Sequence, residues 1–205
     1  AIVRGGGDLA TGIIYRLWKA GYAVLSLEIE TPLVVRRTVS AASAVFDGST
    51  VIEDMEAVRI DSLNDFSFDR SRISVLVDPE GESISILKPD ILVDAIMAKR
   101  NLGTNKERAP LVIGIGPGFS APGDVDAVIE TKRGHWLGRV IRNGSAIPNT
   151  GVPGLIKGYT IERLLRSPGE GYVIPIKSIG DSVIPGDVVA HVEGLPVCSQ
   201  IEGIV

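Results

Sequence analysis

Apolar and polar residues alternate along the first hundred residues in the rhythm of strands separated by helices. Short aliphatic runs predict strands at Ala1–Arg4 and Ala23–Glu28, and the intervening segment Asp8–Ala20 repeats its apolar positions at helical spacing. Gly21 follows that segment, where a helix commonly ends in a left-handed residue. This succession of strand, helix and strand predicts an α/β fold with a parallel sheet.

The pattern continues and then changes character near residue 120. Gly and Pro interrupt the chain every few residues beyond Gly118, and the apolar runs become short and β-branched, as in a small antiparallel β module. We therefore expect an α/β domain at residues 1–120 and a β-rich module at residues 121–205. The other predicted elements are a helix at Arg36–Phe46, short strands within Val51–Ile60, strands at Ser74–Asp78, Ile91–Met97 and Leu111–Gly116, and a short helix at Ser83–Leu87.

Composition narrows the class of protein. Twenty-one basic and 25 acidic residues give a net charge of −4, so no diffuse basic surface is expected to bind nucleic acid. No apolar run approaches the roughly 20 residues that span a bilayer, so no membrane partner is expected. One Cys and two His cannot form an internal disulfide or a zinc-finger set, and we predict no metal site. With no secretory signal visible, these features favour a cytoplasmic protein.

A glycine-rich segment follows the first predicted strand and opens the first predicted helix. Gly5, Gly7 and Ala10 occupy the three positions of the GxGxxG/A fingerprint of dinucleotide-binding folds. Glycine lets the chain turn tightly and exposes helix N-terminal amides to an anion. Glu28 ends the second predicted strand, at about the spacing where an acid bonds a ribose. These residues predict a site for a phosphate-bearing small molecule in a Rossmann-like domain.

Other interpretations of this segment stay open. Three consecutive glycines also suit a tight turn without any ligand, and Asp8 repels a phosphate unless it faces away or pairs with Arg4. Two arginines at the start of the next predicted helix either clamp a phosphate or carboxylate or form surface salt bridges. The candidate binding residues of this half are Gly5, Gly6, Gly7, Ala10, Thr11, Glu28, Arg36 and Arg37.

A second glycine cluster follows the most apolar predicted strand. Gly114, Gly116 and Gly118 are expected at the carboxyl edge of the sheet, where ligands bind in open parallel sheets, or alternatively in a linker. Asp78 and Asp94 each end an apolar run and either contact a ligand near that edge or cap the following turn.

One histidine is a candidate for proton transfer. His135 stands in the stretch ETKRGH, and its imidazole ordinarily titrates near neutral pH. No nucleophilic Ser motif or Cys partner completes a triad around it, so a structural role is the alternative. His191 and Cys198 are interpreted as structural, the cysteine as a small buried residue.

Four stretches carry a resemblance to a known family: RGGGDLATGIIYRLWKAGY, RRTVSAASAVFDG, LVIGIGPGFSAPGDVDAVIETKRGHWLGRV and NTGVPG. They resemble the selenium-dependent molybdenum hydroxylase system proteins of the YqeB type, along nearly the whole chain. The resemblance implies a cytoplasmic accessory protein for maturation of a molybdenum hydroxylase, with an N-terminal Rossmann-like domain. Its partners would be the hydroxylase or its maturation factors, and no catalytic residue transfers with the resemblance.

The tail DSVIPGDVVAHVEGLPVCSQIEGIV resembles a biotinyl/lipoyl half-barrel, which makes the second module barrel-like or hammerhead-like. The hairpin reads Glu193-Gly194-Leu195-Pro196 and lacks the modified lysine of such domains, which disfavours a swinging arm. The chain stops inside an apolar run, so a truncated C-terminus is one expectation.

The residues and the resemblance leave three hypotheses for function. The first is the accessory protein, binding NAD(P), another nucleotide or molybdopterin over Gly5–Gly12. The second is an NAD(P)-dependent oxidoreductase with His135 as proton donor. The third is a scaffold without catalytic activity that docks a partner enzyme.

Overall fold

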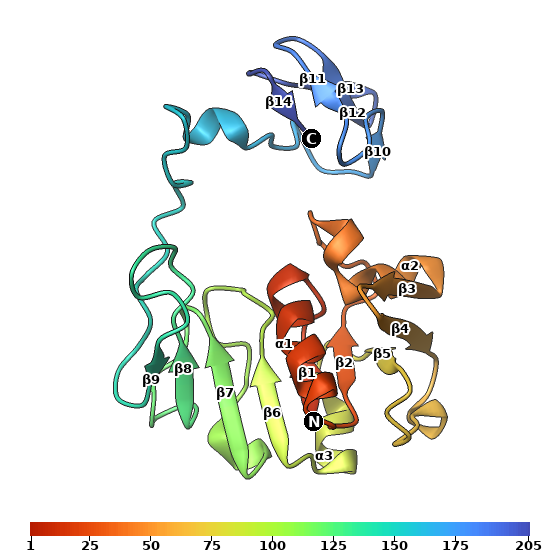
Figure 1. The fold of residues 1–205 in the computed structure, drawn as a ribbon, viewed down its shortest axis with the longest axis vertical. Coiled ribbons are helices and arrows are strands. Elements are labelled where there is room, and N and C mark those ends of the chain that lie inside the picture. The colour runs from red at the N-terminus through yellow and green to blue at the C-terminus, as the bar shows by residue number, and fades with distance from the viewer. The chain divides into compact units, whose positions relative to one another are not determined.

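A nine-stranded, mostly parallel sheet is built from residues 2–141 in the computed structural model, which describes all of residues 1–205 (Figure 1). The strands lie in the order β3-β4-β5-β2-β1-β6-β7-β8-β9, and only the pairs β3/β4 and β8/β9 are antiparallel. The strands are β1 (Ile2–Arg4), β2 (Leu25–Glu28), β3 (Ser49–Ile52), β4 (Met55–Ile60), β5 (Ile73–Val77), β6 (Ile91–Asp94), β7 (Leu111–Ile115), β8 (Ala127–Ile129) and β9 (Val140–Ile141).

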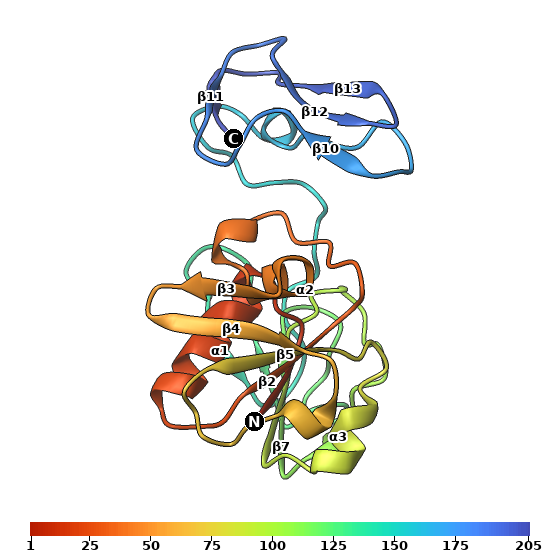
Figure 2. The same cartoon turned by 90° about the vertical axis from the view of Figure 1, so that its right-hand side faces the viewer.

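Alternate residues of the central strands enter two cores on opposite faces of this sheet. Val3 packs in the core beneath α1 (Asp8–Lys19), whereas Ile2 packs in the core that contains Ile84 of α3 (Glu82–Leu87). Figure 2 shows these two helices on opposite sides of the strands. Period-two burial on both faces explains why the strands read as continuous apolar runs. The mixed α/β class and the large parallel sheet agree with the sequence prediction.

The helix predicted at Arg36–Phe46 is broken into three short pieces. They are the 3₁₀ turns η1 (Arg37–Val39) and η2 (Ala41–Ser43) and a single turn of α-helix, α2 (Ala44–Asp47). The Ser40 hydroxyl donates to the Arg36 carbonyl at 2.6 Å and the Ser43 hydroxyl donates to the Arg37 carbonyl at 2.7 Å. Such local side-chain bonds compete with the helical pattern, which explains the interruption. Two further 3₁₀ turns are η3 (Leu63–Asp65) and η4 (Lys106–Arg108).

The chain divides into compact units at Ala1–Asn149 and Thr150–Val205 rather than near residue 120. Strand β8 pairs in parallel with β7, and β9 pairs antiparallel with β8, so both strands extend the main sheet. A short β-branched run suits either kind of sheet, and the sequence pattern does not reveal which strand it pairs with. The second glycine cluster, for which a linker was the alternative interpretation, therefore lies within the first unit.

The second unit contains short antiparallel strands. Strands β10 (Val173–Pro175), β12 (Val188–Val192) and β13 (Leu195–Cys198) form one sheet, and β11 (Ser182–Val183) pairs with β14 (Gly203–Ile204). A 3₁₀ turn, η5 (Ile161–Arg163), precedes them. Cys198 is exposed, so its interpretation as a buried residue was wrong. The barrel-like or hammerhead-like form stays a prediction. No helix in either unit has both the length and the apolar character to cross a bilayer.

Candidate functional site

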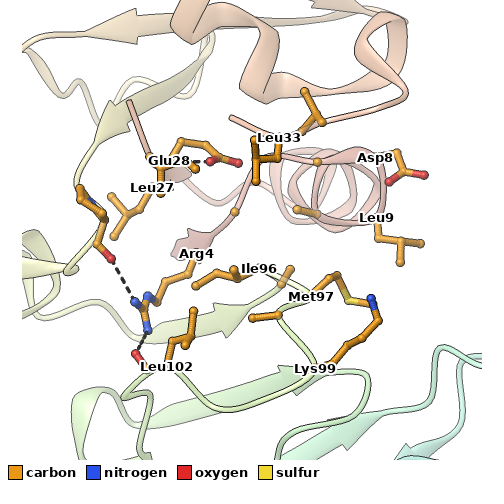
Figure 3. Close-up of a pocket in the computed structure, with 18 of the residues that line it drawn as sticks. Arg4, Asp8, Leu9, Leu27, Glu28, Leu33, Ile96, Met97, Lys99 and Leu102 are labelled. Atoms are coloured by element: carbon orange, nitrogen blue, oxygen red, sulfur yellow. Dashed lines mark hydrogen bonds between the residues drawn. The ribbon is translucent and has the colours of Figure 1, made fainter. Parts of the chain in front are cut away.

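A cavity of about 890 Å³ opens at the carboxyl edge of the sheet in the first unit. Residues that follow β1, β2, β5 and β6 line it, and Figure 3 shows Glu28 and Leu33 facing Arg4, Ile96 and Met97 across it. Strands β1 and β6 are neighbours, but the chain continues from β1 to β2 and from β6 to β7, in opposite directions along the strand order. Open parallel sheets bind ligands at such a reversal, because the two diverging connections leave a crevice between them.

The three consecutive glycines have different physical roles. Gly5 has a φ of +98°, and a Cβ there would lie 2.9 Å from the Ala95 carbonyl oxygen; a Cβ on Gly6 would lie 2.9 Å from the Ala42 nitrogen. Both residues therefore allow close packing of the protein's own backbone. Gly7 has ordinary extended angles and meets only Val34, at 3.6 Å. Of the three, Gly7 is the glycine whose missing side chain leaves open space at the cavity.

Helix α1 begins at this open position. Gly7 is its N-cap residue, and no side chain caps the first turn. The partial positive charge of a helix N-terminus attracts anions. Asp8 pairs with Arg36 at 2.6 Å instead of with Arg4. Arg36 also lines the cavity, so its guanidinium lies beside the place where the helix N-terminus attracts negative charge.

The Glu28 carboxylate is bound to the glycine loop itself. Its Oε1 accepts a hydrogen bond from the Gly6 amide at 2.6 Å, and its Oε2 accepts one from the Ile29 amide at 3.0 Å. Burial raises the pKa of Glu28, although these two amides act in the opposite direction. Glu28 lines the cavity as expected, but a ligand hydroxyl would have to share its oxygens with the loop.

Replacement of Glu28 by Gln is expected to change the pH dependence of stability. A carboxyl whose folded pKa is raised above its ordinary value of 4.5 stabilises the fold below that value and loses the contribution as the pH rises through the folded pKa. The melting temperature of the wild type, relative to Glu28→Gln, should fall as the pH rises from about 4.5 toward neutrality. A constant difference across this range, measured by calorimetry, would show that burial does not disfavour the ionised carboxylate.

A buried network around Arg4 forms one wall of the cavity. The guanidinium Nη1 donates to Thr104 Oγ1 at 2.7 Å and lies 3.4 Å from Asp94 Oδ2, and Nη2 donates to the Pro79 carbonyl at 3.2 Å. The Thr104 hydroxyl donates to Asp94 Oδ2 at 2.6 Å. This network ties together β1, β6 and the chain after β5. No sequence pattern predicted this network, although an arginine directly after two aliphatic strand residues was an available signal.

Asp78 has the capping role that the sequence left as an alternative. Its carboxylate accepts from the Glu82 amide at 3.0 Å, from the Ser83 amide at 2.9 Å and from the Ser83 hydroxyl. Burial alone would raise the pKa of Asp78, but these hydrogen bonds outweigh it and lower the pKa. Asp78 therefore holds the start of α3 while it lines the cavity.

The second glycine cluster packs against the protein's own chain. A Cβ on Gly114 would lie 2.5 Å from the Phe119 ring, and one on Gly116 would lie 2.8 Å from Thr131 Oγ1. Gly118 borders a second, smaller cavity of about 440 Å³, whereas neither Gly114 nor Gly116 lines either cavity. Internal packing accounts for these glycines without a ligand.

The remaining candidates lie in the cavity, in the loop that supports it, or outside it. Ala10 lines the cavity, and Thr11 supports the loop, because its hydroxyl donates to the Gly7 carbonyl at 2.8 Å and accepts from the Ala41 amide at 2.9 Å. Arg37 lies outside the cavity, 3.7 Å from Asp47 and over the Phe46 ring. His135 is exposed beside Trp136, with ring centroids 4.9 Å apart, and lines neither cavity.

Comparison with known proteins adds one relative. The chain is 45% identical over 206 residues to a protein of Escherichia coli (strain K12) whose name is "Uncharacterized protein YqeB". This chain is similar to YqeB. The match covers the whole chain but only 38% of the length of YqeB, so this chain corresponds to part of that protein. No protein-family model matches the chain, and no solved structure matches it. The resemblance to YqeB-type proteins is thus supported, without an activity attached.

Proposed function

We propose that the first unit binds a nucleotide-like or pterin-like phosphate ligand in the large cavity. The observation that carries the proposal is the position of the cavity, beside Gly7 and the start of α1 at the carboxyl ends of parallel strands. The strand order supports a Rossmann-like interpretation, because β5-β2-β1-β6-β7-β8 corresponds to the order 3-2-1-4-5-6 of dinucleotide-binding sheets.

The walls of the cavity suit a ligand with an anionic group and an apolar ring. An anion beside Gly7 would meet the N-terminus of α1 and the Arg36 guanidinium, which would exchange Asp8 for the ligand. Leu33 and Leu9 are 88% and 45% exposed at the cavity, and an aromatic ring would cover their apolar surface.

The biological role that we propose is that of an accessory protein in the maturation of a selenium-dependent molybdenum hydroxylase. It is supported by the resemblance to YqeB-type proteins, and the partners would be the hydroxylase or its maturation factors. The oxidoreductase hypothesis assigned proton transfer to His135, which lies outside both cavities, so no observation favours it. NAD(P), another nucleotide and molybdopterin are the ligands to compare.

A thermal-shift series with NAD(P), ATP, CTP and molybdopterin analogues tests the proposal. A ligand that binds only the folded state raises the melting temperature by mass action. At a free concentration of one hundred times its Kd it adds about 2.7 kcal/mol to the free energy of unfolding. We expect at least one of these compounds to stabilise the chain. Stabilisation without hydride transfer would support the accessory role, whereas turnover of NAD(P)H would support an enzyme. The absence of any stabilisation would contradict ligand binding and leave only the hypothesis of a scaffold that docks a partner enzyme.

The variant Gly7→Asp is expected to abolish this stabilisation while the fold persists. The extended backbone at Gly7 accepts any residue, and aspartate is a preferred N-cap, so the new carboxylate would occupy the position of the ligand anion. The matched control is Gly12→Asp, which adds the same charge where no atom lies within 4 Å of the new Cβ. Affinity should fall at least tenfold, or about 1.4 kcal/mol, for the first variant only. Equal affinities of both variants, measured by calorimetric titration, would place the anion elsewhere.

A further inference from the structure

A single loop separates the two cavities at the edge of the sheet. Residues 95–100 follow β6, and the side of the loop that faces α1 lines the large cavity through Ile96 and Met97. Lys99 lines both the cavity of about 890 Å³ and the cavity of about 440 Å³. In Figure 3 the Lys99 side chain extends beside Met97, and its amino group ends on the side of Leu9. One cation is therefore accessible from both cavities.

The loop is held between the two glycine clusters. The Cβ missing from Gly5 would meet the Ala95 carbonyl at 2.9 Å, and the one missing from Gly118 would meet the Arg100 nitrogen at 2.7 Å. The two glycine clusters, which their sequence pattern predicts to contact a ligand, thus position the loop between the cavities.

The backbone of the loop is unusual at the residues that line the cavities. Met97 and Lys99 have φ values of +63° and +62°, a conformation that residues with side chains rarely adopt. Such a conformation persists only where its surroundings impose it, and it is concentrated at functional sites. Lys99 takes part in none of the five ion pairs of the protein, so its charge is available to a ligand.

The smaller cavity differs chemically from the larger one. Hydroxyl and amide side chains line it, on Ser120, Ser145 and Asn149, beside the buried ring of Phe119. The carboxylate of Asp124 also lines it and accepts a hydrogen bond from the Ser120 amide at 2.8 Å. These groups suit a sugar or another neutral polar group, whereas the large cavity offers apolar surface for a ring. A volume of about 440 Å³ lies within the range of about 300–1,000 Å³ that is usual for ligand sites, so a second organic group has room there.

We infer that the ligand has two organic parts joined by an anionic linker such as a diphosphate, with Lys99 paired to the linker. The inference rests on the proposed function and adds the class of ligand to it. The ring-bearing part lies in the large cavity against Leu33, the anionic linker lies between Gly7 and Lys99, and the polar part lies in the smaller cavity. The loop of residues 95–100 lies between the two organic parts. A mononucleotide would use only the first half of such a site.

Calorimetric titration of the chain with ADP, ADP-ribose and NAD⁺ tests this inference, because the three compounds share one nucleoside diphosphate and differ in the second part. ADP-ribose or NAD⁺ is expected to bind at least tenfold more tightly than ADP. Ser145→Trp, which fills the smaller cavity from an exposed position, should remove this preference and leave ADP binding intact. Lys99→Met should weaken the binding of all three compounds at least tenfold.

The matched control for the lysine is Lys88→Met. Lys88 is also exposed and also has a positive φ, of +46°, but it lies at the end of α3 and lines neither cavity, so the variant should bind like the wild type. Equal affinity for ADP and both larger compounds would overturn the two-part ligand while nucleotide binding stands. An unchanged Lys99→Met variant would overturn the role of Lys99. If only other phosphate compounds stabilise the chain, the two-part inference fails, and if none does, the proposed function fails with it.

Discussion

Arg4→Met is expected to lower the free energy of unfolding by about 3–5 kcal/mol, because it leaves a buried carboxylate without its counter-charge. The Arg4 and Asp94 side chains are only 4% and 3% exposed. Methionine keeps much of the volume of the arginine stem, so the loss arises from charge and hydrogen bonding rather than from a cavity. Without the guanidinium, Asp94 keeps only the Thr104 hydroxyl and the Ile96 amide as donors.

Urea unfolding of a double-variant cycle measures this effect. Asp94→Asn added to Arg4→Met removes the unpaired charge, so the double variant should regain about 1–3 kcal/mol relative to Arg4→Met alone. A loss below about 1 kcal/mol for Arg4→Met would show that water or a neighbouring group compensates for the charge. If the two single variants were simply additive, Arg4 and Asp94 would not interact across β1 and β6.

Gly118→Ala is the second variant for which we expect a large loss of stability, of about 2–6 kcal/mol. Two costs add at this position. The φ of +116° is rarely adopted by residues with a Cβ, and the new atom would lie within 2.7–2.9 Å of three backbone atoms of Arg100. Backbone atoms cannot rotate away as a flexible side chain does, so the whole loop of residues 95–100 would have to move. With typical stabilities of about 5–15 kcal/mol, such a loss is substantial.

Gly123→Ala is the control for this second variant. It lies five positions along the same connection from β7 to β8, has no positive φ, and its nearest neighbour for a new Cβ is the Ser120 carbonyl at 3.7 Å. Its free energy of unfolding should stay within about 0.5–1 kcal/mol of the wild-type value. Comparable losses for the two variants would mean that the connection as a whole, rather than the contact of Gly118 with Arg100, sets the stability.

The pattern of apolar residues was sufficient to predict most elements of the first unit. The predicted segments match helix α1 and strands β1, β2, β5, β6 and β7, with bounds that differ by at most a few residues. The strands were predictable because a strand buried on both faces gives a continuous aliphatic run, and the helix because its apolar positions repeat at helical spacing. The prediction was wrong where side chains compete with the backbone, as at Ser40, and it placed the end of the first unit too early. The partner of a short strand such as β8 depends on contacts distant in sequence.

The candidate site was predicted only in outline. The sequence indicated the edge of the sheet and the glycine loop, but Gly5, Gly6 and Gly114 are needed for contacts with Ala95, Ala42 and Phe119 that no local pattern reveals. The same holds for Glu28. An acid at the end of a strand predicts contact with a ligand, but in the structure the Glu28 carboxylate accepts a hydrogen bond from the Gly6 amide. Arg4 and Lys99 were not identified, because their roles arise from neighbours or cavities formed by several segments.

The sequence by itself determined that this chain builds a parallel sheet with a glycine turn before its first helix, since periodic burial and glycine freedom are local properties of the chain. Only the tertiary structure decided which glycine is open to the cavity, which acids already accept hydrogen bonds from the protein and which lysine lies between two cavities. The reason is physical. Close approach, burial and pairing of charges depend on residues such as Arg4 and Asp94, which are far apart in sequence and meet only when the strands pair.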